Sequence, residues 1–135
     1  MITAVDTNIL FDVLLNDPTF EASSQEALQR GVREGTLVIG EIVYVEVAGF
    51  FSQQADLEAF LNDSGIRLIH STAGALWKAG ELWNTFCRPH RQARDAARRI
   101  PADFLIGAHA LLQADRLLTR DRGFYRACFR DLPLA

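Results

Sequence analysis

Short apolar runs alternate with longer amphipathic segments along the chain, and this alternation limits its fold more than any other feature. Residues 2–5, 37–39, 66–69 and 117–118 have the length and apolar character of buried strands. Between them, residues 20–34, 72–87 and 103–113 carry apolar side chains at helical spacing. Strands that alternate with helices form parallel sheets covered on both faces. We therefore predict an α/β fold, a three-layer α/β/α sandwich with a short parallel sheet.

Size and composition are those of an ordinary globular protein. The 135 residues contain no linker or internal repeat, so we expect a single domain over residues 1–135. The net charge of −3 provides no global basic field for binding nucleic acids. We see no signal peptide, and the apolar segment 37–51 is too short to cross a membrane and contains Glu41 and Glu46. We therefore expect no membrane association. Cys87 and Cys128 form no metal or redox motif, so we interpret them as free thiols and expect a cytoplasmic location.

Asp6 stands at the point where the first predicted strand ends. The residues after it repeat apolar side chains at helical spacing, so Asp6 should lie at the mouth of a strand-to-helix turn. In open α/β sheets, the carboxyl ends of the strands are where ligands bind. Thr7 and Asn8 follow as residues that form local hydrogen bonds. A simpler interpretation is that Asp6, Thr7 or Asn8 only caps the helix.

Three other acids occupy positions that pattern alone does not explain. Glu46 lies within the apolar run 42–48, IVYVEVA, whose helix we expect to be largely buried. Asp103 precedes an apolar run at the start of a helix, where the helix dipole favours an anion. Asp121 follows the last strand in a turn. If the sheet is parallel, Asp6 and these three acids can converge at one edge.

Converging carboxylates need a cation. Two unit charges about 4 Å apart repel by roughly 4 kcal/mol at an effective dielectric of 20. A site with oxygen ligands only suits Mg²⁺ or Mn²⁺, and such an ion supports phosphodiester hydrolysis. The alternatives are that Asp103 and Asp121 are simple caps and that Glu46 pairs with a buried arginine. The remaining acids near these elements we interpret as surface or capping residues: Asp12, Glu41, Asp56 and Glu58.

The acids and their neighbours resemble those of PIN domains, most of all the VapC toxins of bacterial toxin–antitoxin pairs. The motifs that carry this resemblance are AVDTNIL at 4–10, Glu46, PADFLIGAHA at 101–110 and LTRDRGF at 118–124. The resemblance implies a metal-dependent endoribonuclease whose acidic site is Asp6, Glu46, Asp103 and Asp121. It also implies that hydrogen bonds from Thr7, Asn8 and Thr119 hold the site. It further implies a homodimer and a VapB-like antitoxin that inserts a peptide across the site.

An arginine-rich segment at 88–99 precedes Asp103. Arg91, Arg94 and Arg98 share a face if this segment is helical, and we expect them to contact RNA phosphates. The alternatives are a solvated face or a surface that docks the antitoxin. We do not expect His70 or His109 to be metal ligands. The larger aromatic side chains we interpret as core or dimer residues: Phe50, Phe51, Trp77 and Trp83.

Two other function classes are compatible with parts of this pattern. A phosphatase of the haloacid-dehalogenase type also uses an aspartate after its first strand. It needs a second aspartate two positions later, where this chain has Asn8, and a lysine late in the fold, whereas the only lysine is Lys78. A non-catalytic PIN module that binds RNA or protein is the other alternative, and a metal-dependent nuclease assay separates it from the enzyme.

Overall fold

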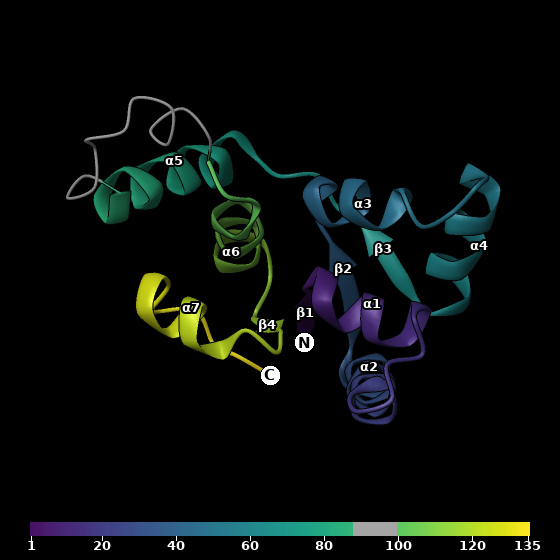
Figure 1. Ribbon diagram of the computed structural model, residues 1–135. Coiled ribbons are helices and arrows are strands. Elements are labelled where there is room, and N and C mark those ends of the chain that lie inside the picture. Colours follow the sequence, from purple (N-terminus) through teal and green to yellow (C-terminus); the bar gives the residue numbers. More distant parts are fainter. Residues whose placement is uncertain (88–99) are drawn as a thin grey trace.

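The sheet has four parallel strands in the order β3-β2-β1-β4 (Figure 1). A computed structural model describes residues 1–87 and 100–135. The strands are β1 (Ile2–Val5), β2 (Thr36–Ile39), β3 (Ile66–Leu68) and β4 (Arg116–Leu118). The central strand β1 pairs with both β2 and β4, so that Ala4 lies opposite Val38 on one side and Leu117 on the other. The predicted parallel sheet is confirmed.

The described part of the chain forms seven helices, which connect and cover the strands. They are α1 (Thr7–Leu14), α2 (Glu21–Glu34), α3 (Glu41–Ala48), α4 (Gln54–Asp63), α5 (Ala73–Cys87), α6 (Ala102–Gln113) and α7 (Arg122–Cys128). Figure 1 shows α5 beside α6 near β4 and α4 beside β3 at the other end of the sheet. Helix α1 contacts both α2 and α3. The predicted α/β sandwich is therefore confirmed.

Two glycines make the tight connections possible. Gly65 has a φ of +69°, a left-handed conformation that allows the chain to turn from α4 into β3. Gly35 follows α2, and a Cβ added there would lie 1.9 Å from the carbonyl oxygen of Met1. Only glycine therefore lets the start of β2 approach the start of β1, where Thr36 N donates to the same carbonyl at 2.9 Å.

The core lies on both faces of the sheet. Leu37, Ile39 and Leu117 have no exposed surface, and Val5 is 1% exposed. Strands that are buried on both faces have continuous apolar runs instead of an alternating pattern. This explains why β2 is visible in the sequence as a short apolar segment, whereas β3 at the end of the sheet contains the exposed Arg67. None of the described helices is long and apolar enough to cross a membrane.

Helix α3 is less buried than its composition indicates. Only Val43 and Val47 are buried, because these residues are four apart and form one narrow stripe that faces the core. Val45 is 67% exposed, and Glu46 is exposed as well. The expectation of a largely buried helix is therefore wrong. Trp77 on α5 is 76% exposed, which excludes it from the core and leaves the dimer interpretation.

Candidate active site

The carboxylate of Asp6 is buried at the carboxyl end of β1 and is surrounded by hydrogen-bond donors. The residue is the N-cap of α1, and its Oδ1 accepts from the backbone N of Thr7 at 2.7 Å. Its Oδ2 accepts from Thr119 Oγ1 at 2.7 Å and from Asn8 Nδ2 at 3.2 Å. Asp6 therefore does cap the helix, but capping uses only one of its two oxygens, and the other is tied to the turn after β4.

The turn after β4 is held against the start of α1 by side-chain hydrogen bonds. Thr119 Oγ1 accepts from the backbone N of Asp121 at 3.0 Å and from Asn8 Nδ2 at 3.3 Å. Asn8 Oδ1 in turn accepts from the backbone N of Arg120 at 3.3 Å. These bonds fix the position of Asp121 relative to Asp6, although the two residues are far apart in the sequence.

Glu46 approaches the site from the last turn of α3. Its Oε1 accepts a hydrogen bond of 2.9 Å from Thr7 Oγ1, so Thr7 contacts Asp6 through its backbone and Glu46 through its side chain. Thr7 is thus a partner of Glu46, and among residues 1–87 and 100–135 no arginine forms an ion pair with it. Because Glu46 is exposed, its carboxylate faces solvent at the edge of the site.

Asp103 and Asp121 lie at the starts of two other helices. Asp103 is the second residue of α6, and it is half-buried. Asp121 is the N-cap of α7, but its side chain makes no capping hydrogen bond, so capping does not account for it. Burial raises the pKa of Asp103, and the charges of Asp6 and Asp121 raise it further. The carboxylates of Asp6 and Asp121 are therefore close enough to repel that of Asp103.

Burial and like charges together disfavour the ionised form of Asp6. Burial is the main cause that raises its pKa, and Glu46 adds to it. Hydrogen bonds from Thr119 and Thr7 oppose this shift but do not cancel it. The four predicted acids therefore form a chain of interacting charges, in which Glu46 acts on Asp6, Asp6 acts on Asp103, and Asp121 also acts on Asp103.

The sequence and the fold both match a known family. The sequence model of the PIN domain matches residues 3–130. The chain belongs to the PIN domain family. Comparison with curated proteins gives no match. Three solved structures that resemble it come from VapBC complexes, and each similarity covers 100% of this chain.

These three structures differ in how closely they resemble this PIN domain. VapBC2 from Rickettsia felis, bound to a DNA fragment from its promoter, is 23% identical over 98% of that chain, with a TM-score of 0.72. VapBC-1 from nontypeable Haemophilus influenzae is 25% identical over 97% of that chain, with a TM-score of 0.68. DNA-bound VapBC from Salmonella typhimurium is 17% identical over 97% of that chain, with a TM-score of 0.64. The predicted VapC-like PIN fold is confirmed.

The ligands that this PIN domain offers are oxygens. Among residues 1–87 and 100–135, no group of three or more His, Cys, Asp or Glu side chains is close enough to hold a metal ion as it stands. Glu46 and Asp121 are exposed, so their side chains can rotate towards Asp6 without repacking the core. Carboxylate and hydroxyl oxygens fit Mg²⁺ or Mn²⁺. Burial first, and like charges second, raise the pKa values of Asp6 and Asp103.

Sequence reasoning missed the role of Asp12, which we had interpreted as a surface or capping residue. Asp12 is 2% exposed, and its carboxylate accepts from Ser24 Oγ at 2.6 Å and from Nε of Arg120 at 2.7 Å. The guanidinium of Arg120 also lies 4.0 Å from the ring centroid of Phe20. A signal for this burial was present, because Asp12 lies three residues after the buried Ile9 and therefore on the apolar face of α1.

His70 and His109, the histidines of the described residues, lie outside the acidic site. His109 is 3% exposed, and its Nε2 lies 2.8 Å from the carbonyl oxygen of Ile69. Burial lowers the pKa of His109, so this ring is neutral and belongs to the core. His70 is exposed. The three arginines predicted to bind RNA lie outside the described residues: Arg91, Arg94 and Arg98.

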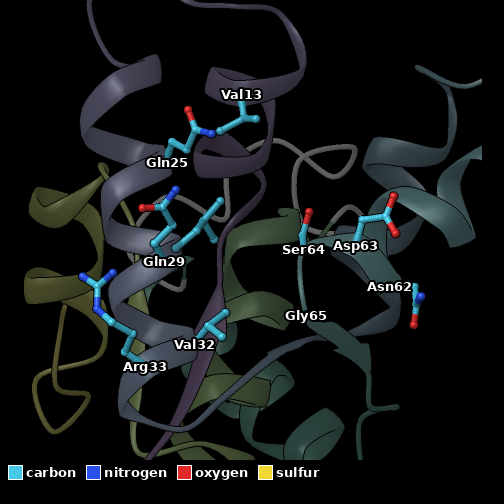
Figure 2. A pocket seen from close by; sticks show the side chains of 10 residues that line it. Val13, Gln25, Gln29, Val32, Arg33, Asn62, Asp63, Ser64 and Gly65 are labelled. Carbon is cyan, nitrogen blue, oxygen red and sulfur yellow. The ribbon is translucent and has the colours of Figure 1, made fainter.

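A hollow of about 530 Å³ lies between α2 and the turn that joins α4 to β3. Figure 2 shows the polar side chains of Gln25, Gln29 and Arg33 from α2 along one side of it and Asp63 and Ser64 on the other. None of the four predicted acids lines this hollow.

Proposed function

We propose that this PIN domain is an endoribonuclease that depends on Mg²⁺ or Mn²⁺ and acts as the toxin of a type II toxin–antitoxin pair. The observation that carries the proposal is the burial of the Asp6 carboxylate at the carboxyl end of the central strand. This burial raises the pKa of Asp6, and the charge of Glu46 adds to the shift. Burying a charge next to like charges costs stability unless a cation compensates it. A cation at this edge would remove that cost.

The proposed ligands of the cation are Asp6, Glu46, Asp103 and Asp121. A divalent ion held by these carboxylates lowers the pKa of a bound water and balances charge on a phosphate during phosphodiester hydrolysis. Thr119 and Asn8 hold Oδ2 of Asp6, and Thr7 holds Oε1 of Glu46. The role of these three residues is to keep the two carboxylates in fixed orientations towards the cation and the substrate.

The proposed substrate is RNA, which would bind across the carboxyl ends of the strands where the acids lie. The proposed location of the protein is the cytoplasm. We propose that Arg91, Arg94 and Arg98 contact the phosphates of this RNA, because they are the densest group of positive charges that lies close in sequence to a site acid, Asp103. Their contribution is electrostatic and independent of base sequence. Recognition of a particular RNA would then depend on its folded shape and on unpaired bases near the cleaved bond.

The proposed partners are a VapB-like antitoxin and a second copy of the chain. The antitoxin is supported by the similarity of the whole chain to chains of VapBC complexes. The homodimer is supported by α5, on which Trp77 is 76% exposed and Leu76 is 48% exposed. Neighbouring apolar side chains with this much exposure are typical of a surface that is covered in an assembly.

The decisive experiment measures cleavage of RNA in Mn²⁺, in Mg²⁺ and in excess EDTA. Wild-type protein should cleave only with a divalent ion, and Asp6→Asn and Asp103→Asn should abolish cleavage while leaving the circular dichroism spectrum unchanged. Asp56→Asn, an exposed acid in the first turn of α4, is the matched control and should cleave normally. Full activity in EDTA or in Asp6→Asn would end the nuclease proposal. Metal-independent binding of RNA without cleavage would favour the non-catalytic PIN module.

A further inference from the structure

Tyr125 carries a buried hydroxyl that has no hydrogen-bond partner among the described residues. The residue lies in α7 and has no exposed surface. Its ring packs edge-on against Phe124, with ring centroids 5.0 Å apart and an interplanar angle of 85°. It also packs against Phe129, with ring centroids 5.8 Å apart. A buried tyrosine hydroxyl normally finds a partner, because leaving it unpaired costs stability. The position of this hydroxyl therefore needs an explanation.

The hydroxyl of Tyr125 faces the acidic site. Burial raises its pKa most, and the charges of Asp6, Asp103 and Asp121 raise it further, so the group is protonated and able to donate. In return it lowers the pKa of Asp6, as a donor would. The contact nevertheless falls short of the geometry of a hydrogen bond, so the hydroxyl lies near Asp6 without being bound to it.

The burial of this hydroxyl decides what it can contact. Because the oxygen has no accessible surface, an RNA phosphate cannot reach it, and direct contact with the substrate is excluded. Asp6 is within reach, and the helix that carries Tyr125 also carries Asp121 at its N-cap. A small movement of either carboxylate, such as ion binding requires, would change the distance between the hydroxyl and Asp6.

We propose that Tyr125 is a positioning residue of the acidic site, whose hydroxyl donates to the Asp6 carboxylate when a divalent cation is held there and is left unpaired without it. The inference rests on the proposed function, because it needs a cation at Asp6. The hydroxyl would complete the set of donors formed by Thr119, Asn8 and the backbone of Thr7. It therefore favours the ion-bound arrangement over the ion-free one.

The test removes only the hydroxyl, in Tyr125→Phe, and measures Mn²⁺ binding by titration calorimetry together with thermal melting in EDTA. A hydrogen bond to a charged group that forms only in the bound state should make the Mn²⁺ dissociation constant about ten-fold larger when it is lost. In EDTA the variant should melt at the same temperature as wild type or higher, because an unpaired buried hydroxyl has been removed. Tyr44→Phe is the matched control, since its hydroxyl bonds Glu58 on the surface and should not affect Mn²⁺ binding.

Each outcome separates the inference from the function on which it rests. Equal Mn²⁺ affinities for Tyr125→Phe and wild type would overturn the inference and leave the nuclease proposal intact. A lower melting temperature of Tyr125→Phe in EDTA would also overturn it, because the hydroxyl would then be paired without the ion. If wild type and Asp6→Asn bound Mn²⁺ equally, the metal site itself would be wrong, and the inference would fail with it.

Discussion

The guanidinium of Arg120 donates two hydrogen bonds to the buried carboxylate of Asp12, from Nε at 2.7 Å and from Nη2 at 2.8 Å. The pair joins α1 to the turn after β4, across 108 positions of sequence. That turn carries Thr119, which holds Asp6, and Asp121. The ion pair therefore lies outside the acidic site but fixes the turn on which half of the site depends.

Arg120→Ala should destabilise the protein by about 2 kcal/mol or more, because it leaves the charge of Asp12 buried and unpaired. Arg120→Lys should lose less, since it keeps the charge but not the two parallel hydrogen bonds. The measurement is urea unfolding followed by circular dichroism. Arg30→Ala is the control, because Arg30 and Glu26 form an exposed pair on α2 that should be worth about 0.5 kcal/mol at most. Equal losses in Arg120→Ala and Arg30→Ala would show that the Asp12 pair contributes no more than a surface pair.

Asp103→Asn should stabilise the ion-free protein at pH 7. The folded-state pKa values of Asp6 and Asp103 are raised, so these groups favour the fold when protonated and lose that contribution as pH rises through the folded pKa. The gain from Asp103→Asn should therefore shrink as pH falls towards 5. Millimolar Mg²⁺ should raise the melting temperature of wild type and raise that of the variant less.

Thermal melts of wild type and Asp103→Asn in EDTA and in Mg²⁺, at pH 7 and pH 5, check this prediction. Asp56→Asn again serves as the control, because an exposed acid of α4 should show neither the gain nor its pH dependence. If Asp103→Asn were less stable than wild type in EDTA, the main role of Asp103 would be at the start of α6, where an acid favours the helix dipole.

Replacing any of Arg91, Arg94 and Arg98 by alanine should weaken RNA binding at low salt. Each lost phosphate contact on single-stranded RNA should reduce the slope of log affinity against log salt by roughly 0.7. Binding of labelled RNA to the catalytically inactive Asp6→Asn protein at several salt concentrations measures this slope without cleavage. An unchanged slope and affinity in Arg94→Ala would assign the cluster to solvent or to the antitoxin.

The chain should form a homodimer at micromolar concentration, with Trp77 in the contact. Trp77→Glu should convert it to a monomer, because a charge in an apolar interface has no partner. Light scattering on the purified protein measures the mass. Leu15→Glu, at an exposed apolar position after α1, should leave the dimer intact. A wild-type monomer would refute the prediction, and a Trp77→Glu dimer would move the interface elsewhere.

The strands and the placement of Asp6 could be predicted because buried parallel strands are continuously apolar and end abruptly at polar residues. The exposure of Glu46 could not be predicted, because residues 42–48 are almost uniformly apolar. Such a run does not reveal which side of the helix faces the core. The burial of Asp12 depends on Arg120, which lies on a distant segment. Likewise, the unpaired hydroxyl of Tyr125 results from packing between α7 and the site, which no local pattern of residues encodes.

The hydrogen bond from Thr119 to Asp6 spans 113 positions and has a consequence for synthesis of the chain. The central strand β1 is made before the other described strands, and its neighbour β4 is the last of the four to leave the ribosome. A nascent chain therefore has an open edge on β1 and lacks the turn that holds Asp6. Because the strand that closes the sheet also brings Thr119 and Asp121, a partly synthesised chain contains Asp6 but not the assembled acids. The proposed nuclease activity would therefore be absent from the nascent chain until β4 and the turn after it have been synthesised.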